Sequence, residues 1–319
     1  MRSHPSSGTS RVHRTLRLPL ALGLACGVAA LATLPGTAAR ASGVALRTSG
    51  YTHVIEVVME NLGYSSATTY SGYQTLAHRY ASASNSYAAA HPSLPNYLDL
   101  TAGTTFGVSS DCTSCYQTSN NLGAQLSAKR VTWDDFSEGV PGPCFLGAST
   151  GSGYAGKHNP FRYYTDIRKN RSLCRHLLPL TSLMTDLRRV KSMPRFSFVT
   201  PNLCHDGHDC SPSVAFSWLQ SFVKSVTASS AWKQHGLLVV TWDEGADSDT
   251  STVLPNDQIH GNGGGGHVAT LLIAPGVRAG TVVTAPMTHE SLLASIESNF
   301  HLAMLRGAAK WSAHTLVIP

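Results

Sequence analysis

Charged residues are scarce in this sequence, and the excess of positive charge is confined to one end of it. Only 13% of the 319 residues are Asp, Glu, Lys or Arg. Residues 1–41 hold five of the 24 basic residues and no acidic residue, so residues 42–319 carry 19 basic and 18 acidic residues. A chain this close to neutral has no electrostatic basis for nucleic-acid binding, and we predict no nucleic-acid partner.

The basic N-terminal segment has the organisation of a secretory signal peptide. Four arginines precede an apolar run, Leu18–Leu34, which leads through Pro35-Gly36 to the A-x-A site Ala39-Arg40-Ala41. A membrane anchor is the alternative, but the run is only marginally long enough to span a bilayer. We therefore predict a signal peptide over 1–41, one folded domain over 42–319, and a secreted protein without a stable membrane anchor.

Two familiar binding motifs are missing. The glycine-rich residues 261–266 are not followed by Gly-Lys-Ser or Gly-Lys-Thr, which excludes a P-loop. Cys112-Thr-Ser-Cys115 has no second C-x-x-C pair, so a zinc knuckle or a redox pair is weakly supported. An even number of cysteines in an exported chain favours disulfides, although the sequence does not define their pairing. The six candidates are Cys112, Cys115, Cys144, Cys174, Cys204 and Cys210.

Strand-like and helix-like segments alternate along the rest of the chain, without internal repeats. Short apolar runs bounded by turn residues predict strands, and apolar residues at helical spacing predict helices. This alternation predicts an α/β layered domain with a largely parallel sheet. The expected strands are 53–59, 131–133, 195–200, 237–242 and 268–274, and the expected helices are 93–101, 121–129, 180–190, 214–226 and 290–300.

Two long irregular segments, 145–165 and 246–266, interrupt this alternation. Long loops inside a compact domain are usually functional or disordered. The first contains Gly147-Ala-Ser-Thr-Gly151, which matches the G-x-S-x-G nucleophile motif of α/β-hydrolases. That motif requires a strand before it and a helix after it, and neither is expected here, so we do not assign it a catalytic role.

Acidic side chains follow two of the most apolar strands. Glu60-Asn61 comes directly after strand 53–59, and Asp243-Glu244 comes directly after strand 237–242. The carboxyl ends of parallel strands meet at one edge of a sheet, so these side chains are expected to lie together. Each pair alone could be a solvated turn. Acids beside a buried strand need a partner, however, and their oxygens suit Mg²⁺, Ca²⁺ or Mn²⁺, with Zn²⁺ possible if a histidine joins.

Ser93 lies between two prolines in His91-Pro-Ser-Leu-Pro-Asn96, immediately before a helix-like run. Proline restricts its own backbone and that of the preceding residue, so the serine is presented on a stiff elbow. Serine is also a common helix N-cap, and this segment alone favours that interpretation. A serine hydroxyl needs a base or a metal to become a nucleophile, and the predicted carboxylate site would supply the metal.

Histidines near the expected strand ends are candidates to bind phosphate oxygens or to protonate a leaving group. They are His91, His158, His205, His208 and His267.

Six blocks of the sequence together resemble the bacterial secreted phosphoesterase family, which includes acid phosphatases and phospholipase C-type enzymes within the alkaline-phosphatase-like superfamily. They occur in the order of that family and span about residues 52–301. The blocks are Val57-Val-Met-Glu-Asn61, His91-Pro-Ser-Leu-Pro-Asn-Tyr-Leu98, Lys157-His-Asn-Pro-Phe161, Thr200-Pro-Asn-Leu-Cys-His-Asp-Gly-His-Asp-Cys210, Thr241-Trp-Asp-Glu-Gly245 and Gly266-His-Val-Ala-Thr270.

The resemblance implies a three-layer α/β/α sandwich and assigns roles to individual residues. By this comparison Ser93 is the nucleophile and a metal ligand, with Glu60, Asn61, Asp243 and Glu244 as the other ligands. His158, His205 and His267 are expected in the phosphate site, and we assign His91, Asn96 and His208 to substrate binding. Asp-Glu-Gly stands where two-metal relatives have Asp-His-Gly, which favours one divalent cation of the four named above.

These expectations define an exported, metal-dependent hydrolase of small phosphate esters, with residues 42–319 as its catalytic domain. Ser93 would attack phosphorus and form a phosphoseryl intermediate that water then hydrolyses. The alternatives are a phosphodiesterase or phospholipase C, and a secreted binding protein that retains the fold without turnover.

Overall fold

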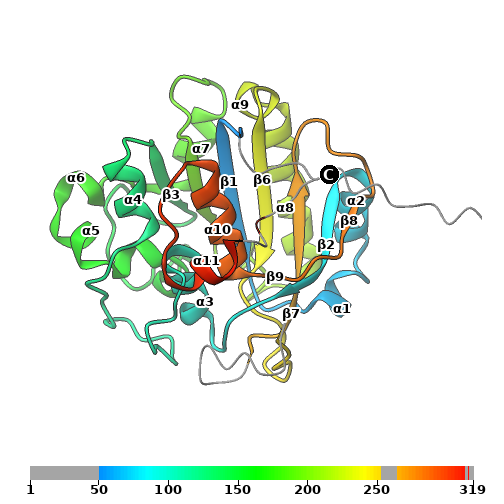
Figure 1. The fold of residues 1–319 in the computed structure, drawn as a ribbon, viewed down its shortest axis with the longest axis horizontal. Helices are drawn as coiled ribbons and strands as arrows, with labels where there is room; N and C mark the ends of the chain where they lie inside the picture. The colour runs from blue at the N-terminus through cyan, green and yellow to red at the C-terminus, as the bar shows by residue number, and fades with distance from the viewer. Residues whose placement is uncertain (1–49, 253–263, 313–314, 316–319) are drawn as a thin grey trace, which may run out of the picture. The chain divides into compact units, whose positions relative to one another are not determined.

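The computed structural model describes residues 50–252, 264–312 and 315. The segment predicted as a signal peptide, 1–41, and part of the irregular segment 246–266 lie outside the described residues. The described chain is built on a nine-stranded sheet with the order β4-β3-β5-β1-β6-β7-β2-β8, and β9 pairs with β2 (Figure 1). The strands are β1 His53–Met59, β2 Ala81–Tyr87, β3 Trp133–Ser137, β4 Leu177–Pro179, β5 Phe196–Thr200, β6 Gly236–Trp242, β7 His267–Ile273, β8 Val282–Val283 and β9 Met287–Thr288.

Strand direction determines which residues reach the carboxyl edge of the sheet. β4, β3, β5, β1 and β6 run parallel to one another, as the sequence predicted. β7 is antiparallel to both β6 and β2. Its first residue, His267, therefore lies at the edge where β1 and β6 end. In register, Met59 of β1 pairs with Trp242 of β6, so Glu60 and Asp243 leave the sheet side by side.

Helices cover both faces of the sheet, which confirms the predicted α/β/α sandwich (Figure 1). The helices are α1 Tyr64–Ala67, α2 Ser71–Arg79, α3 Ser93–Ala102, α4 Leu122–Ala128, α5 Thr165–Lys169, α6 Arg171–Cys174, α7 Leu180–Asp186, α8 Pro212–Ala228, α9 Ser230–Lys233, α10 His289–Asn299 and α11 Arg306–Lys310, with 3₁₀ turns η1 Gly156–His158 and η2 Pro160–Tyr163.

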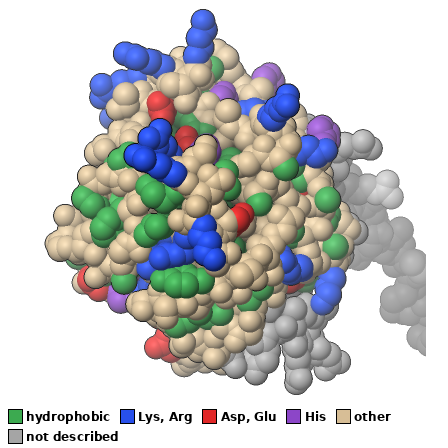
Figure 2. All heavy atoms as spheres, turned by 90° about the vertical axis from the view of Figure 1, so that its left-hand side faces the viewer, with side chains coloured by type: hydrophobic (Ala, Val, Ile, Leu, Met, Phe, Trp, Pro, Cys, Tyr) green, Lys and Arg blue, Asp and Glu red, His purple; other side chains and the backbone are tan. Residues whose placement is uncertain are grey.

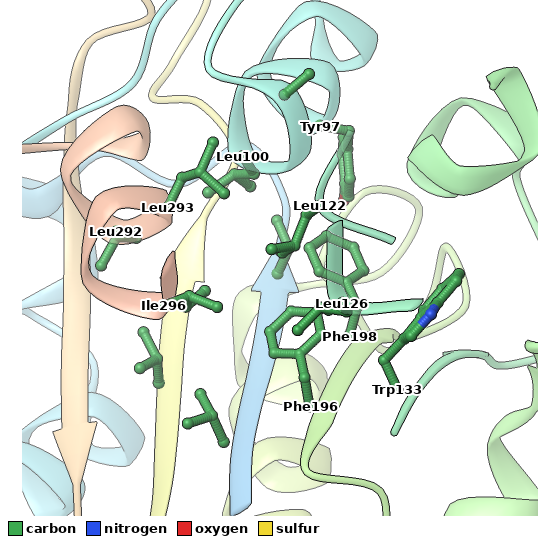
Figure 3. Close-up of a cluster of buried hydrophobic side chains, with 14 of the residues drawn as sticks. Tyr97, Leu100, Leu122, Leu126, Trp133, Phe196, Phe198, Leu292, Leu293 and Ile296 are labelled. Carbon is green, nitrogen blue, oxygen red and sulfur yellow. The ribbon is translucent and has the colours of Figure 1, made fainter. Parts of the chain in front are cut away.

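Successive side chains of β1 alternate between two hydrophobic cores, because strand side chains point to opposite faces. Val54 and Val58 belong to the core shared with α3, α4 and α10, part of which is drawn in Figure 3. Ile55 and Val57 belong to the core shared with α2, α7 and α8. A strand buried on both faces is apolar along most of its length, which is why β1 and β6 were visible in the sequence.

Five strands were missed or misplaced. β4, β8 and β9 are only two or three residues long and were not predicted. β2 was missed because its sequence, Ala-Ser-Ala-Ser-Asn-Ser-Tyr, is small and polar and gives no apolar signal. β3 was expected over 131–133 but begins at Trp133 and continues through Asp134-Asp135. The buried carboxylate of Asp135 accepts a hydrogen bond from Asn159 at 2.7 Å, a tertiary partner that the local sequence does not reveal.

The six predicted cysteines form three disulfides: Cys112–Cys115, Cys144–Cys174 and Cys204–Cys210. The disulfide interpretation of the C-x-x-C pair is therefore confirmed. Among the described residues, no helix combines the length and the apolar character needed to cross a membrane. On the side of the molecule seen in Figure 2, Lys and Arg side chains lie in several separate groups with hydrophobic side chains between them.

Candidate active site

Three carboxylates from two neighbouring strands converge at the carboxyl edge of the sheet. Glu60 follows β1, and Asp243 and Glu244 follow β6. One oxygen of each lies within 4.8 Å of the others, and all three side chains are buried. The convergence expected from parallel strands is present in the structure, and the register of β1 and β6 produces it.

This cluster fits a divalent cation. Asp243 Oδ1 accepts hydrogen bonds from the amides of Asn61 at 3.2 Å and Glu244 at 2.7 Å. Asp243 Oδ2 is buried and accepts no hydrogen bond from any described residue. Burial and the neighbouring charges of Glu60 and Glu244 raise the pKa of Asp243 well above its usual range. A bound cation would relieve that cost, and an all-oxygen donor set suits Mg²⁺, Ca²⁺ or Mn²⁺.

Asn61 takes part in this cluster through its backbone. Its φ of 50° is in the left-handed region, which asparagine tolerates better than most residues. This conformation accompanies the hydrogen bond from its amide to Asp243, while its side chain is exposed. The predicted role of the Asn61 side chain as a metal ligand stays a prediction.

Ser93 is the first residue of α3 and is buried beside the carboxylates. Pro92 occupies the N-cap position and makes no side-chain capping hydrogen bond, so the N-cap interpretation of Ser93 is wrong. The hydroxyl instead donates to Glu244 Oε1 at 3.3 Å. The nucleophile predicted from the Pro-Ser-Leu-Pro elbow therefore contacts a predicted metal ligand.

Lys157 also contacts Ser93. It was not assigned a role from the sequence. Its Nζ lies 3.3 Å from Ser93 Oγ, 2.9 Å from Asp111 Oδ2 and 3.4 Å from His208 Nε2. The ammonium group thus places a positive charge next to the Ser93 hydroxyl. The only available sequence signal was its position immediately before His158 in the Lys-His-Asn-Pro block.

His158 is buried between two carboxylates. Its Nε2 contacts Glu60 Oε1, and its Nδ1 lies 3.2 Å from Asp206 Oδ2. Burial alone would lower the pKa of His158, but Glu60 and Asp206 raise it to about 9. Burial would likewise raise the pKa of Glu60, yet the charges of His158 and Lys157 hold it at about 2. His158 is therefore a buried cation that keeps Glu60 ionised.

His91 and Asn96 hold the elbow in place. His91 Nδ1 lies 2.6 Å from Glu244 Oε2, and its Nε2 lies 2.9 Å from the carbonyl oxygen of Asp249. Asn96 is fully buried, and its Oδ1 accepts hydrogen bonds at 3.0 Å from the amides of Ala89 and Ala90. The structure gives both residues positioning contacts around Ser93.

The remaining predicted histidines lie in different surroundings. His205 Nδ1 contacts Glu138 at 2.9 Å, away from the carboxylate cluster. His267 is stacked between the rings of Tyr64 and Tyr87, with centroid distances of 4.5 and 4.8 Å. His208, by contrast, directs its Nε2 towards the Nζ of Lys157, the lysine that contacts Ser93.

The fold is similar to that of solved alkaline-phosphatase-like proteins. A protein in the alkaline phosphatase superfamily from Vibrio parahaemolyticus matches with a TM-score of 0.54 over 83% of this chain and 71% of that chain, at 12% identity. This likeness supports the fold class that the motifs predicted.

The chain belongs to the Phosphoesterase family, whose model matches residues 41–303. It is 28% identical to an acid phosphatase of Aspergillus fumigatus over 80% of this chain and 56% of that protein. It is 30% identical to a phosphatidylinositol-3-phosphatase of Mycobacterium tuberculosis over 79% of this chain and 78% of that protein. The chain thus spans little more than half the length of the fungal relative. The family is the one that the motifs predicted, and both relatives are named as phosphatases.

Proposed function

We propose that the protein is an exported, metal-dependent phosphomonoesterase that works through a phosphoseryl intermediate on Ser93. One observation supports this most strongly. Ser93 Oγ lies 3.3 Å from both Glu244 Oε1 and Lys157 Nζ, at the N-terminus of α3. A hydroxyl between a candidate metal ligand and a cation can be deprotonated, and the amides and dipole at the helix start favour an incoming anion.

The candidate metal ligands are Glu60, Asp243, Glu244, the side chain of Asn61 and Ser93. A divalent cation bound there would supply Lewis acidity, favouring the ionised serine and neutralising charge on the phosphoryl group. His158 keeps Glu60 ionised, and Asn61 and Glu244 fix one oxygen of Asp243 through their amides. The protein thus maintains an anionic, preorganised ligand set.

The chain's own residues would carry out the transfer in two steps. Ser93 Oγ attacks phosphorus while Lys157 stabilises the negative charge on the phosphoryl oxygens. In the first step Lys157 passes a proton to His208 Nε2, which accepts its hydrogen bond, and takes the proton that Ser93 loses. His208 then protonates the leaving oxygen as its bond to phosphorus breaks. In the second step His208 takes a proton from the attacking water, and a proton returns through Lys157 to Ser93 Oγ as the phosphoserine bond breaks, which frees Ser93 and phosphate.

The relatives narrow the substrate to be tested first. An acid phosphatase and a phosphatidylinositol-3-phosphatase both cleave a phosphate monoester, as their names state. A small phosphomonoester, free or on an inositol head group, is therefore the leading substrate class. A phosphodiesterase or phospholipase C activity, or a binding protein without turnover, remains as the alternative from the motifs.

Ser93→Ala tests the assignment of the nucleophile. We expect loss of at least about a thousandfold in kcat on a chromogenic phosphomonoester, with unchanged thermal unfolding, because the small substitution removes only the hydroxyl. The wild-type protein is assayed in parallel on a phosphomonoester, a bis-ester, a phosphoinositide and phosphatidylcholine, with and without added divalent ions. Retained activity in the alanine variant would remove Ser93 as nucleophile, and no turnover on any substrate would favour the binding protein.

A further inference from the structure

Asp111 contacts two hydrogen-bond donors close to Ser93, the amide of Leu94 and the Nζ of Lys157. Its Oδ1 accepts a hydrogen bond at 3.0 Å from the amide of Leu94, the residue after Ser93. Its Oδ2 lies 2.9 Å from Lys157 Nζ, which is itself 3.3 Å from Ser93 Oγ. One carboxylate therefore engages both a free amide of the α3 N-terminus and the ammonium group beside the nucleophile.

These two donors are the ones that a phosphoryl group on Ser93 would need. An amide at a helix N-terminus and a lysine ammonium are standard ligands of phosphate oxygens. Leu94 N and Lys157 Nζ are both within reach of an anion attached to or approaching Ser93 Oγ. A carboxylate resembles a phosphoryl group in presenting two negatively charged oxygens to two donors.

Asp111 also lies in a segment that could release it. Residues 103–121 contain no helix or strand, and residues 107–120 are all exposed or half-buried. The Asp111 side chain itself is 28% exposed, unlike the buried carboxylates Glu60 and Asp243. Displacing it would therefore move a carboxylate towards water and leave no new charge in the core.

We propose that Asp111 is an internal competitor for phosphate, which holds the phosphoryl-binding donors until the substrate's phosphoryl group displaces it. This inference rests on the proposed function for the location of the phosphoryl group. Asp111 weakens the binding of substrate and of product alike, because each must displace its carboxylate from Leu94 N and Lys157 Nζ. Because the phosphate left after hydrolysis meets the same two donors, the competition accelerates product release.

The test is direct binding of inorganic phosphate to the metal-loaded protein by titration calorimetry. Asp111→Asn keeps the size of the side chain and removes its charge, so it competes less well for Lys157. We expect its Kd for phosphate to be about tenfold lower than that of the wild type, which corresponds to about 1.4 kcal/mol. The inhibition constant of phosphate and KM should fall in parallel in the activity assay. Asp111→Ala should tighten phosphate binding further, since it leaves both donors without this partner.

Asp166→Asn is the matched control for the loss of one negative charge. Asp166 is an exposed residue of α5, and its carboxylate accepts hydrogen bonds from the side chain of Asn121 at 3.3 Å. Its Kd for phosphate should change by less than about twofold, because exposed charges are screened. Equal tightening in the control would overturn the proposal, since the effect would then be one of net charge.

A weaker or unchanged affinity in Asp111→Asn, or no detectable phosphate binding in the wild type and either Asp111 variant, would also overturn the proposal. Weaker binding together with a lower kcat would make Asp111 a positioning residue for Lys157. Tighter phosphate binding in a protein that hydrolyses no ester would uphold the competition and reject the proposed function. Thermal unfolding of each variant confirms that the folded protein is compared.

Discussion

Carboxyl groups only a few ångströms apart in this site carry protons to different extents because their partners differ. Glu60 contacts the buried cation His158, which together with Lys157 holds its pKa at about 2 against the effect of burial. Burial and the neighbouring acids raise the pKa of Asp243, whose outer oxygen has no hydrogen-bond partner among the described residues. Asp243 Oδ2 is therefore the atom of the cluster that most requires a cation.

Asp243→Asn should stabilise the metal-free protein and prevent stabilisation by metal. In a chelator, removing one of three crowded carboxylates lowers their repulsion, and a gain of about 1 kcal/mol raises the melting temperature by roughly 2–4 °C. An added divalent ion should raise the melting temperature of the wild type but not of the variant. Differential scanning calorimetry with and without Mg²⁺, Mn²⁺, Ca²⁺ and Zn²⁺ measures both effects. A wild-type melting temperature that responds to none of these ions would contradict a metal site.

Glu56 is a buried acid that the proposed mechanism does not use. It lies on β1 and lines a small cavity with Leu292 and Ile296 of α10, and neither carboxylate oxygen has a hydrogen-bond partner among the described residues. Burial raises the pKa of Glu56 to about 8. The folded protein therefore keeps this proton at pH values where the unfolded chain has released it.

This difference makes the free energy of unfolding depend on pH. Between about pH 4.5 and pH 8 the folded state binds one more proton at Glu56 than the unfolded state, so stability falls as pH rises. The contribution is complete below about pH 4.5 and is lost by about pH 8, with an upper bound on the order of 5 kcal/mol. Glu56→Gln should remove this slope, as measured by urea unfolding from pH 4.5 to 8.5. Parallel pH profiles for the two proteins would show that Glu56 is ionised in the folded state.

At the scale of the elements, two short segments position the site. Helix α11 holds α3, and the loop closed by Cys204–Cys210 holds His158. The carboxyl end of α3 is held by α11, because Gly307 N donates to Gly103 O at 2.9 Å and Arg306 Nη1 donates to Ala102 O at 3.0 Å. The loop closed by Cys204–Cys210 supplies Asp206, which contacts His158 and accepts the amide of His208 at 2.8 Å. The loop therefore positions both a buried partner of the metal site and the candidate acid.

Removing the Cys204–Cys210 disulfide should reduce activity more than stability. This bridge spans six residues and Cys144–Cys174 spans 30, so the chain-entropy model expects losses of about 2 and about 4 kcal/mol respectively. The variant lacking the first bridge should lose at least about tenfold in kcat, because Asp206 and His208 would lose their fixed geometry. The variant lacking the second is the matched control, with the larger loss of stability and the smaller loss of kcat.

The reverse order would contradict the role given to the loop. Steady-state kinetics and urea unfolding provide the two measurements.

At the scale of the whole molecule, the sheet separates two hydrophobic cores and presents its carboxyl edge to the substrate. The side of β1 facing α3 and α10 and the side facing α2 and α8 both lie in hydrophobic cores, so the polar residues of the site collect at the strand ends. The three disulfides lie in the connecting segments around this edge and around β4. Such bridges form in an oxidising compartment, which supports the proposal that the protein is exported.

Export can be tested on the full-length chain. Expressed in a secreting host, the protein should lose residues 1–41 and begin at Ser42, because Ala39-Arg40-Ala41 provides a cleavage site. Intact-mass spectrometry of the secreted material should show that N-terminus and a mass lower by six hydrogens, from three disulfides. An uncleaved chain retained in the membrane fraction would instead support the membrane-anchor alternative.

The convergence of Glu60 with Asp243 and the start of α3 at Ser93 followed from local sequence. Each acid directly follows a largely apolar, fully buried strand, and parallel strands end at one edge. Lys157, Asp111 and Asp206 could not be found this way, because they lie in loops or a single 3₁₀ turn where no periodicity operates. Their roles depend on which loops meet in space.

The sequence by itself therefore determined the layered fold, the carboxylate edge and the nucleophile elbow, since each depends on residues adjacent in the chain or on strand burial. Only the tertiary structure decided which charges pair. Contacts between segments 46 to 64 residues apart, such as Lys157 with Asp111 and with Ser93, arise from packing of the whole chain. Packing also buries His158 between two acids, and those acids raise the pKa of His158 to about 9.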